Sequence, residues 1–93
     1  MNPTTRQKYA LMARLSDALE REAVAEQRST RAHAVTEKAR ETLSRVDDEN
    51  APRALNAFDI ARAEGVAARR DHSETVRVLR RCAEDLLDHV APK

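Results

Sequence analysis

The chain has 93 residues, with one glycine, no tryptophan, and Tyr9 and Phe58 as its aromatic residues. So few large apolar side chains cannot build a thick globular core, and we expect at most one domain of thin helical structure. The 17 basic and 16 acidic residues give a net charge of +1. This balance argues against general nucleic-acid binding, which usually requires a clear basic excess.

Features that would direct the chain to another compartment are absent from the sequence. The start has no apolar run, so we expect no signal peptide, and no stretch approaches membrane-spanning length. Cys82 is the one cysteine, which rules out an internal disulfide framework. A reducing, cytoplasmic location is the simplest interpretation.

The first predicted element is a long helix over about residues 4–46. Thr4 is a candidate N-cap, and Gln7 three residues later would complete a capping box. Strong helix formers then continue without glycine or proline as far as Pro52. At about 1.5 Å per residue, such a helix would span ~60 Å.

A polar connection over residues 47–52 precedes the second helical stretch, which we expect to run from about 52 to 91. Asp71 followed by Glu74 resembles another helix start, so a three-helix form over about 4–46, 52–70 and 72–91 is an alternative. A seven-residue repeat passes through this site unchanged, which favours two helices.

That repeat consists of small residues and predicts the fold class: an all-α antiparallel helical hairpin with a coiled-coil-like, alanine-rich seam. When the chain is folded at Asn50, the small residues of the two halves lie opposite one another, and small side chains let helix backbones approach closely. We call these positions the small series: Ala18, Ala25, Ala32 and Ala39 in the first half, and Ala54, Ala61, Ala68, Thr75 and Cys82 in the second.

A second series runs beside the small series and is apolar only near the two ends of the hairpin. Its members are Leu15, Glu22, Ser29, Thr36 and Leu43 in the first half, and Phe58, Gly65, His72, Leu79 and Leu86 in the second. The pattern predicts two apolar clusters joined by a polar, alanine-lined waist, in which His72 faces Ser29.

The end that holds both termini carries more apolar residues than a two-helix seam needs. A stripe wider than the seam should be covered by a partner, and we expect a homodimer that also binds another protein. The residues predicted for this interface are Met12, Leu19, Val76, Leu79, Cys82, Ala83, Leu86, Leu87 and Val90.

Charges on the last helical stretch bear on how two copies would pair. Three arginines precede three acids there, an order that opposes the helix dipole. Antiparallel pairing of two copies about the Cys82–Ala83 bond would compensate for the unfavourable interaction with the helix dipole. Local ion pairs between residues four apart in the same helix would also do so. The residues concerned are Arg77, Arg80 and Arg81, followed by Glu84, Asp85 and Asp88.

Nothing in the sequence predicts catalysis, a cofactor or a metal. Cys82 and His89 lie about 10 Å apart along one helix face, too far to share a metal directly. No nucleophile–base set, glycine-rich phosphate loop or Cys-x-x-Cys motif is present. The best candidates for anion binding are arginines, which bind two phosphate oxygens at once: Arg69, Arg70, Arg77, Arg80 and Arg81.

These observations predict a non-enzymatic interaction module that acts as a helical dimer, in the role of adaptor, regulator or inhibitor. One alternative is a nucleotide or nucleic-acid binder that uses the arginines. Another alternative is a secreted protein. In its length and its mid-chain turn, the chain resembles the Trp-x-Gly helical hairpins that are exported by type VII secretion. That resemblance implies export without a cleaved signal, although residues 47–52 replace the Trp-x-Gly motif at the turn.

Overall fold

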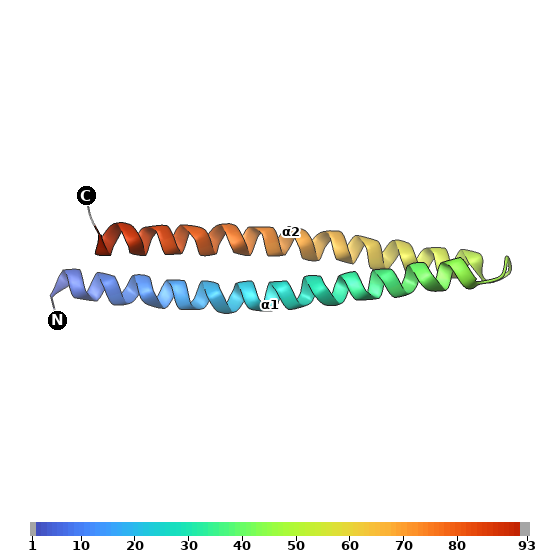
Figure 1. The fold of residues 1–93 in the computed structure, drawn as a ribbon, viewed down its shortest axis with the longest axis horizontal. Coiled ribbons are helices and arrows are strands. Elements are labelled where there is room, and N and C mark those ends of the chain that lie inside the picture. The colour runs from blue at the N-terminus through green and yellow to red at the C-terminus, as the bar shows by residue number, and fades with distance from the viewer. Residues whose placement is uncertain (1, 92–93) are drawn as a thin grey trace.

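The computed structural model describes residues 2–91 and consists of two long helices packed as a hairpin (Figure 1). α1 spans Pro3–Arg45 and α2 spans Ala51–Val90. The two helices run antiparallel, so that both ends of the chain lie at one end of the molecule and the turn lies at the other. We call these the terminal end and the turn end.

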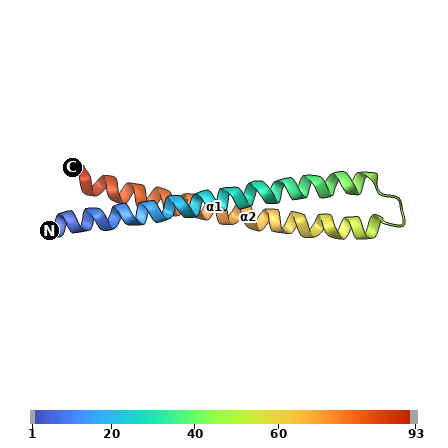
Figure 2. The same ribbon diagram turned by 90° about the horizontal axis from the view of Figure 1, so that it is seen from below.

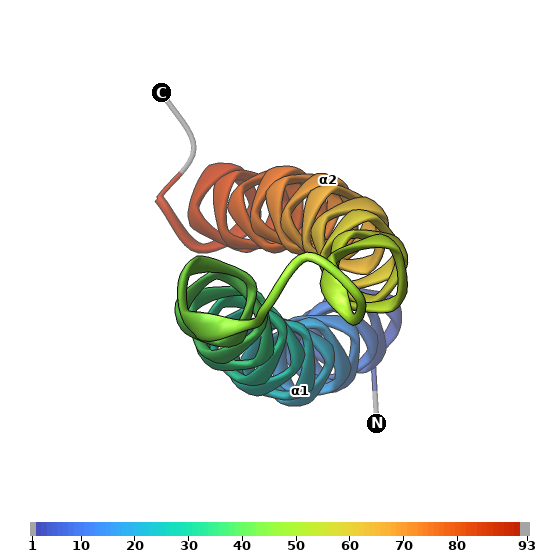
Figure 3. The same cartoon turned by 90° about the vertical axis from the view of Figure 1, so that its right-hand side faces the viewer.

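The hairpin is long and thin. Its principal dimensions are 71 × 23 × 13 Å, and the helices cross at a shallow angle and wind around each other (Figures 2 and 3). Such winding is expected where apolar contacts recur every seven residues, because an α-helix has 3.6 residues per turn and must supercoil to keep the seam buried. The all-α hairpin predicted from the sequence is therefore confirmed.

The small series forms the most buried part of the seam. Ala18 and Ala25 of α1 and Ala61, Ala68 and Cys82 of α2 are the buried residues, and Ala68 is only 1% exposed. Residues of the second series are all half-buried. The larger apolar members of that series, Leu15, Leu43, Phe58, Leu79 and Leu86, are thus covered on one side only.

The second helix continues without a break past Asp71, so the three-helix alternative is wrong. Asp71 does not cap a helix. Its carboxylate lies 3.6 Å from the guanidinium of Arg28 on the other helix, which gives the side chain a partner within a continuous α2.

The first helix begins one residue earlier than predicted, and its cap differs. Asn2 is the N-cap, and its side-chain oxygen accepts a hydrogen bond of 2.7 Å from the backbone N–H of Thr5. Pro3 occupies the first helical position, where a missing N–H costs nothing. The predicted capping box of Thr4 and Gln7 is therefore wrong.

The connection between the helices is Val46–Asn50 and is held by Asp47. The Asp47 carboxylate accepts hydrogen bonds from the backbone N–H of Asn50 at 3.0 Å and from its side-chain amide at 2.9 Å. Asn50 then precedes the first residue of α2, and Pro52 falls in the first turn. The turn was predicted at this place, and α2 begins one residue before Pro52.

Candidate protein interface

The two sides of the seam differ in how α1 and α2 are linked. On one side, Arg14 of α1 lies 3.9 Å from Asp85 of α2, and Arg28 lies 3.6 Å from Asp71. We call this the bridged side. These side chains are about half exposed, and ion pairs of that kind contribute at most about 1 kcal/mol each to stability.

Apart from the His72–Glu22 contact within the seam, no ion pair among residues 2–91 links α1 and α2 on the opposite side, and we call it the unbridged side. His33 and Arg40 of α1 and Arg62 and Arg69 of α2 line one hollow there. Because residues seven apart share a helix edge, the same side continues toward the terminal end. The full set is Met12, Leu19, Glu26, His33 and Arg40 of α1, with Leu55, Arg62, Arg69, Val76, Ala83 and Val90 of α2.

The terminal half of the unbridged side is apolar. Met12 is 45% exposed, Leu19 is 51% exposed and Val90 is 48% exposed, while Val76 and Ala83 are half-buried. Large apolar side chains at regular helical spacing and with half their surface in water are typical of a helix face that packs against another element.

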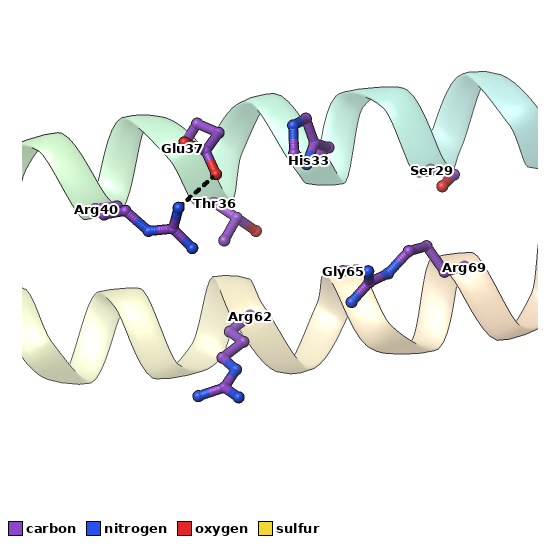
Figure 4. A pocket seen from close by; sticks show the side chains of 8 residues that line it. All are labelled: Ser29, His33, Thr36, Glu37, Arg40, Arg62, Gly65 and Arg69. Carbon is purple, nitrogen blue, oxygen red and sulfur yellow. Dashed lines mark ion pairs between the residues drawn. The ribbon is translucent and has the colours of Figure 1, made fainter.

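The turn half of the unbridged side is cationic. A hollow of ≈ 180 Å³ opens there beside Gly65, whose missing side chain leaves space next to Thr36 (Figure 4). Arg69 extends over Gly65 in the figure, whereas Arg40 pairs with Glu37 at 3.0 Å. The Arg40 guanidinium also lies 5.8 Å from the centre of the Phe58 ring, a distance suited to a cation–π contact.

The structure divides the residues that were predicted as one interface. Five of them lie on the unbridged side: Met12, Leu19, Val76, Ala83 and Val90. Leu79 and Leu86 belong to the seam, and Leu87 is 62% exposed on another face of α2.

Cys82 is buried in the seam with 6% of its surface exposed. The predicted pairing of two copies about the Cys82–Ala83 bond would bring the two Cys82 side chains toward the axis between the copies. In the hairpin this thiol is covered by α1, and the predicted axis between two copies stays a prediction.

The predicted arginine cluster does not form a single site. Arg69 lies in the hollow of Figure 4, whereas Arg77, Arg80 and Arg81 line a separate shallow surface together with Glu74. Arg77 lies 3.2 Å from Glu74 within α2.

The local pairs predicted for the opposed charges on α2 are absent from the described part of the chain, and pairing of these charges between two copies stays a prediction. Asp85 pairs with Arg14 across the seam instead of with a residue of α2. Among residues 2–91, the expected local pairs of Arg80 with Glu84 and Arg81 with Asp85 do not form.

A polar contact that the sequence did not predict lies in the middle of the seam. The Nε2 atom of His72 is 2.9 Å from a carboxylate oxygen of Glu22, and both side chains are largely covered. His72 was expected to face Ser29, and its hydrogen bond is instead with Glu22, one heptad closer to the terminal end. Glu26, one turn further along α1, has a carboxylate oxygen within 4.8 Å of both partners.

Comparison with known proteins returns no match to any protein-family profile, any curated protein or any solved structure. Within the described residues, neither helix has a stretch apolar and long enough to cross a membrane.

Proposed function

We propose that the protein is a non-enzymatic interaction module that forms a homodimer through the apolar, terminal half of its unbridged side. One observation carries this proposal. Every buried residue of the hairpin is small, while Met12, Leu19 and Val90 keep about half of their surface in water. A fold stabilised by apolar burial gains most where large side chains are covered, and a second copy would cover them.

The accessible surface area of the hairpin is large enough to support an interface with a second copy. The hairpin exposes 7502 Å² of accessible surface. A compact protein of its mass would expose roughly 5,400 Å², so the hairpin carries about 2,000 Å² in excess. Interfaces of obligate dimers bury about 2,000–5,000 Å² over both partners, which the excess of two copies can supply.

The charges on the unbridged side favour one of the possible overlaps between the two copies. Full overlap in the same direction places the arginines of the two cationic halves, Arg40, Arg62 and Arg69 of each copy, against one another, and like charges repel. Full overlap in opposite directions places the apolar half of each copy on the cationic half of the other. Overlap of the terminal halves alone avoids both costs and produces an elongated dimer with its turn ends pointing outward.

The experiment is sedimentation of the full chain over a range of concentrations, with two matched variants. Leu19→Glu places a charge on the apolar half, and Leu87→Glu places one on a leucine outside it that is at least as exposed. We expect the parent and Leu87→Glu to sediment as dimers and Leu19→Glu as a folded monomer. A monomeric parent, or an equal effect of the two variants, would contradict the proposal.

The cationic half of the unbridged side supports a second contact, with an acidic segment of a partner protein. Arg62 and Arg69 have no carboxylate partner among residues 2–91. A fluorescent poly-glutamate peptide is a suitable probe. We expect Arg69→Glu to weaken its binding more than Arg70→Glu, which changes the same charge one residue outside the hollow.

The same hollow supports a second candidate function, the binding of a small anion such as a nucleotide. Inorganic pyrophosphate is the probe for that function. Saturable binding of pyrophosphate at one site per chain, lost in Arg69→Glu, would favour it over an acidic protein partner.

A further inference from the structure

We propose that Glu22, Glu26 and His72 form a site for a divalent transition metal that links the two helices across the seam. Zn²⁺ is the probe metal. The proposal does not depend on the dimer, because all three residues belong to one hairpin.

The geometry brings three ligand atoms together from two helices. One atom from each residue lies within 4.8 Å of the other two, and the imidazole Nε2 of His72 is already 2.9 Å from Glu22. Glu22 and Glu26 are four residues apart in α1, so both project on the same side of that helix. Small rotations of these side chains can bring the atoms to the ~2.0–2.2 Å that zinc requires from nitrogen and oxygen ligands.

Apart from His72 itself, the carboxylates of the site have no protein counterion among residues 2–91. Within residues 2–91, no arginine or lysine forms an ion pair with Glu22 or Glu26. Glu22 also occupies a half-buried seam position of the second series, where a carboxylate is costly unless it is paired. Two carboxylates and a neutral imidazole carry a charge of −2, which a divalent cation would balance.

The donor set favours a transition metal over magnesium or calcium. Imidazole nitrogen suits zinc, cobalt and nickel, whereas the hard cations prefer oxygen alone. Glutamates and histidines projecting inward from neighbouring helices are also the ligands used in metal-binding helical bundles. A fourth position would be left for water, because the chain offers three ligands here.

Binding would stabilise the hairpin, since the ligands from α1 and α2 meet only in the folded state. The metal would therefore act at the polar waist of the seam, where Gly65, Ser29 and Thr36 supply little apolar contact. We expect a saturable rise in the melting temperature with Zn²⁺ and none with Mg²⁺.

The test is a titration of the full chain with Zn²⁺, followed by calorimetry and thermal unfolding, and with Co²⁺, followed by its visible absorption. Glu26→Gln removes one ligand without breaking the His72–Glu22 contact, and Glu20→Gln is its control for lost charge on α1. His72→Gln removes the imidazole, and His33→Gln is its control for an exposed histidine.

We expect one metal per chain in the parent and in both controls. Glu26→Gln should weaken binding by more than the roughly 10–100-fold that loss of an outer-shell partner causes, and His72→Gln should abolish it. The site would be refuted if the parent showed no saturable binding, or if His33→Gln removed binding while Glu26→Gln kept it. Leu19→Glu should still bind one metal, so failure of the dimer and failure of the metal site are distinguishable.

Discussion

The hydroxyl of Thr36 in α1 lies 3.1 Å from the backbone carbonyl oxygen of Ala61 in α2 and 2.8 Å from that of Ala32 in its own helix. The single hydroxyl proton is shared between the two carbonyl groups. Such a contact requires the two backbones to approach closely, which the small residues of the seam permit. The same oxygen lies 3.4 Å from the place where a side chain on Gly65 would begin.

Enlarging the most buried small residue should destabilise the hairpin. Ala68 is 1% exposed, and Ala68→Leu would force the helices apart, at a cost of about 1–3 kcal/mol in the free energy of unfolding. Ala67→Leu, at the exposed neighbouring position, should be nearly neutral. Urea unfolding of both variants measures the difference, and equal stabilities would show that the seam is not tight at Ala68.

Filling the glycine position should have the opposite effect. A methyl group at Gly65 would meet Thr36 at an ordinary contact distance of 3.4 Å. Gly65→Ala should therefore keep the helix-propensity gain of up to about 1 kcal/mol in the free energy of unfolding. Ala63→Gly, an exposed change on the same helix, should lose a similar amount. A destabilised Gly65→Ala would mean that the helices are closer here than the contact distance indicates.

The thiol of Cys82 should be protected in the folded protein. Because it is buried against α1, we expect slow reaction with a thiol reagent in buffer and fast reaction in urea. Mild oxidation should yield little disulfide-linked dimer. Rapid reaction in buffer, at the rate seen in urea, would place the thiol at the surface and contradict its burial against α1.

The seam was predictable because its residues recur every seven positions in both halves of the chain. Ala18, Ala25, Ala61, Ala68 and Cys82 were all assigned to the small series, and all five are buried. The periodicity also indicated that α2 passes through Asp71 without a break. The sequence that starts at Asp71 resembles a helix cap, and it did not indicate that Asp71 forms an ion pair with Arg28 of the other helix.

The contacts of long polar side chains were less predictable. The His72 ring forms its hydrogen bond with Glu22 and not with Ser29. A carboxylate is a stronger hydrogen-bond acceptor than a hydroxyl group, and the long histidine side chain can reach it along the seam. A glutamate at a seam position, followed four residues later by Glu26, was a signal that could have indicated the proposed metal site. The difference between the two sides of the seam could not be predicted from the sequence. It depends on the ion pairs that Arg14 and Arg28 form with α2 on one side in the structure.

The central claim, a dimer through the terminal halves, is tested most directly by distances between spin labels on two copies. Ser16 and Ser44 are exposed positions near the terminal end and the turn end of α1, and each would be changed to cysteine in a Cys82→Ser chain. We predict a short distance between copies for the label at residue 16 and a much longer one for the label at residue 44. Absence of any coupling between copies, or a shorter distance at residue 44, would contradict the account.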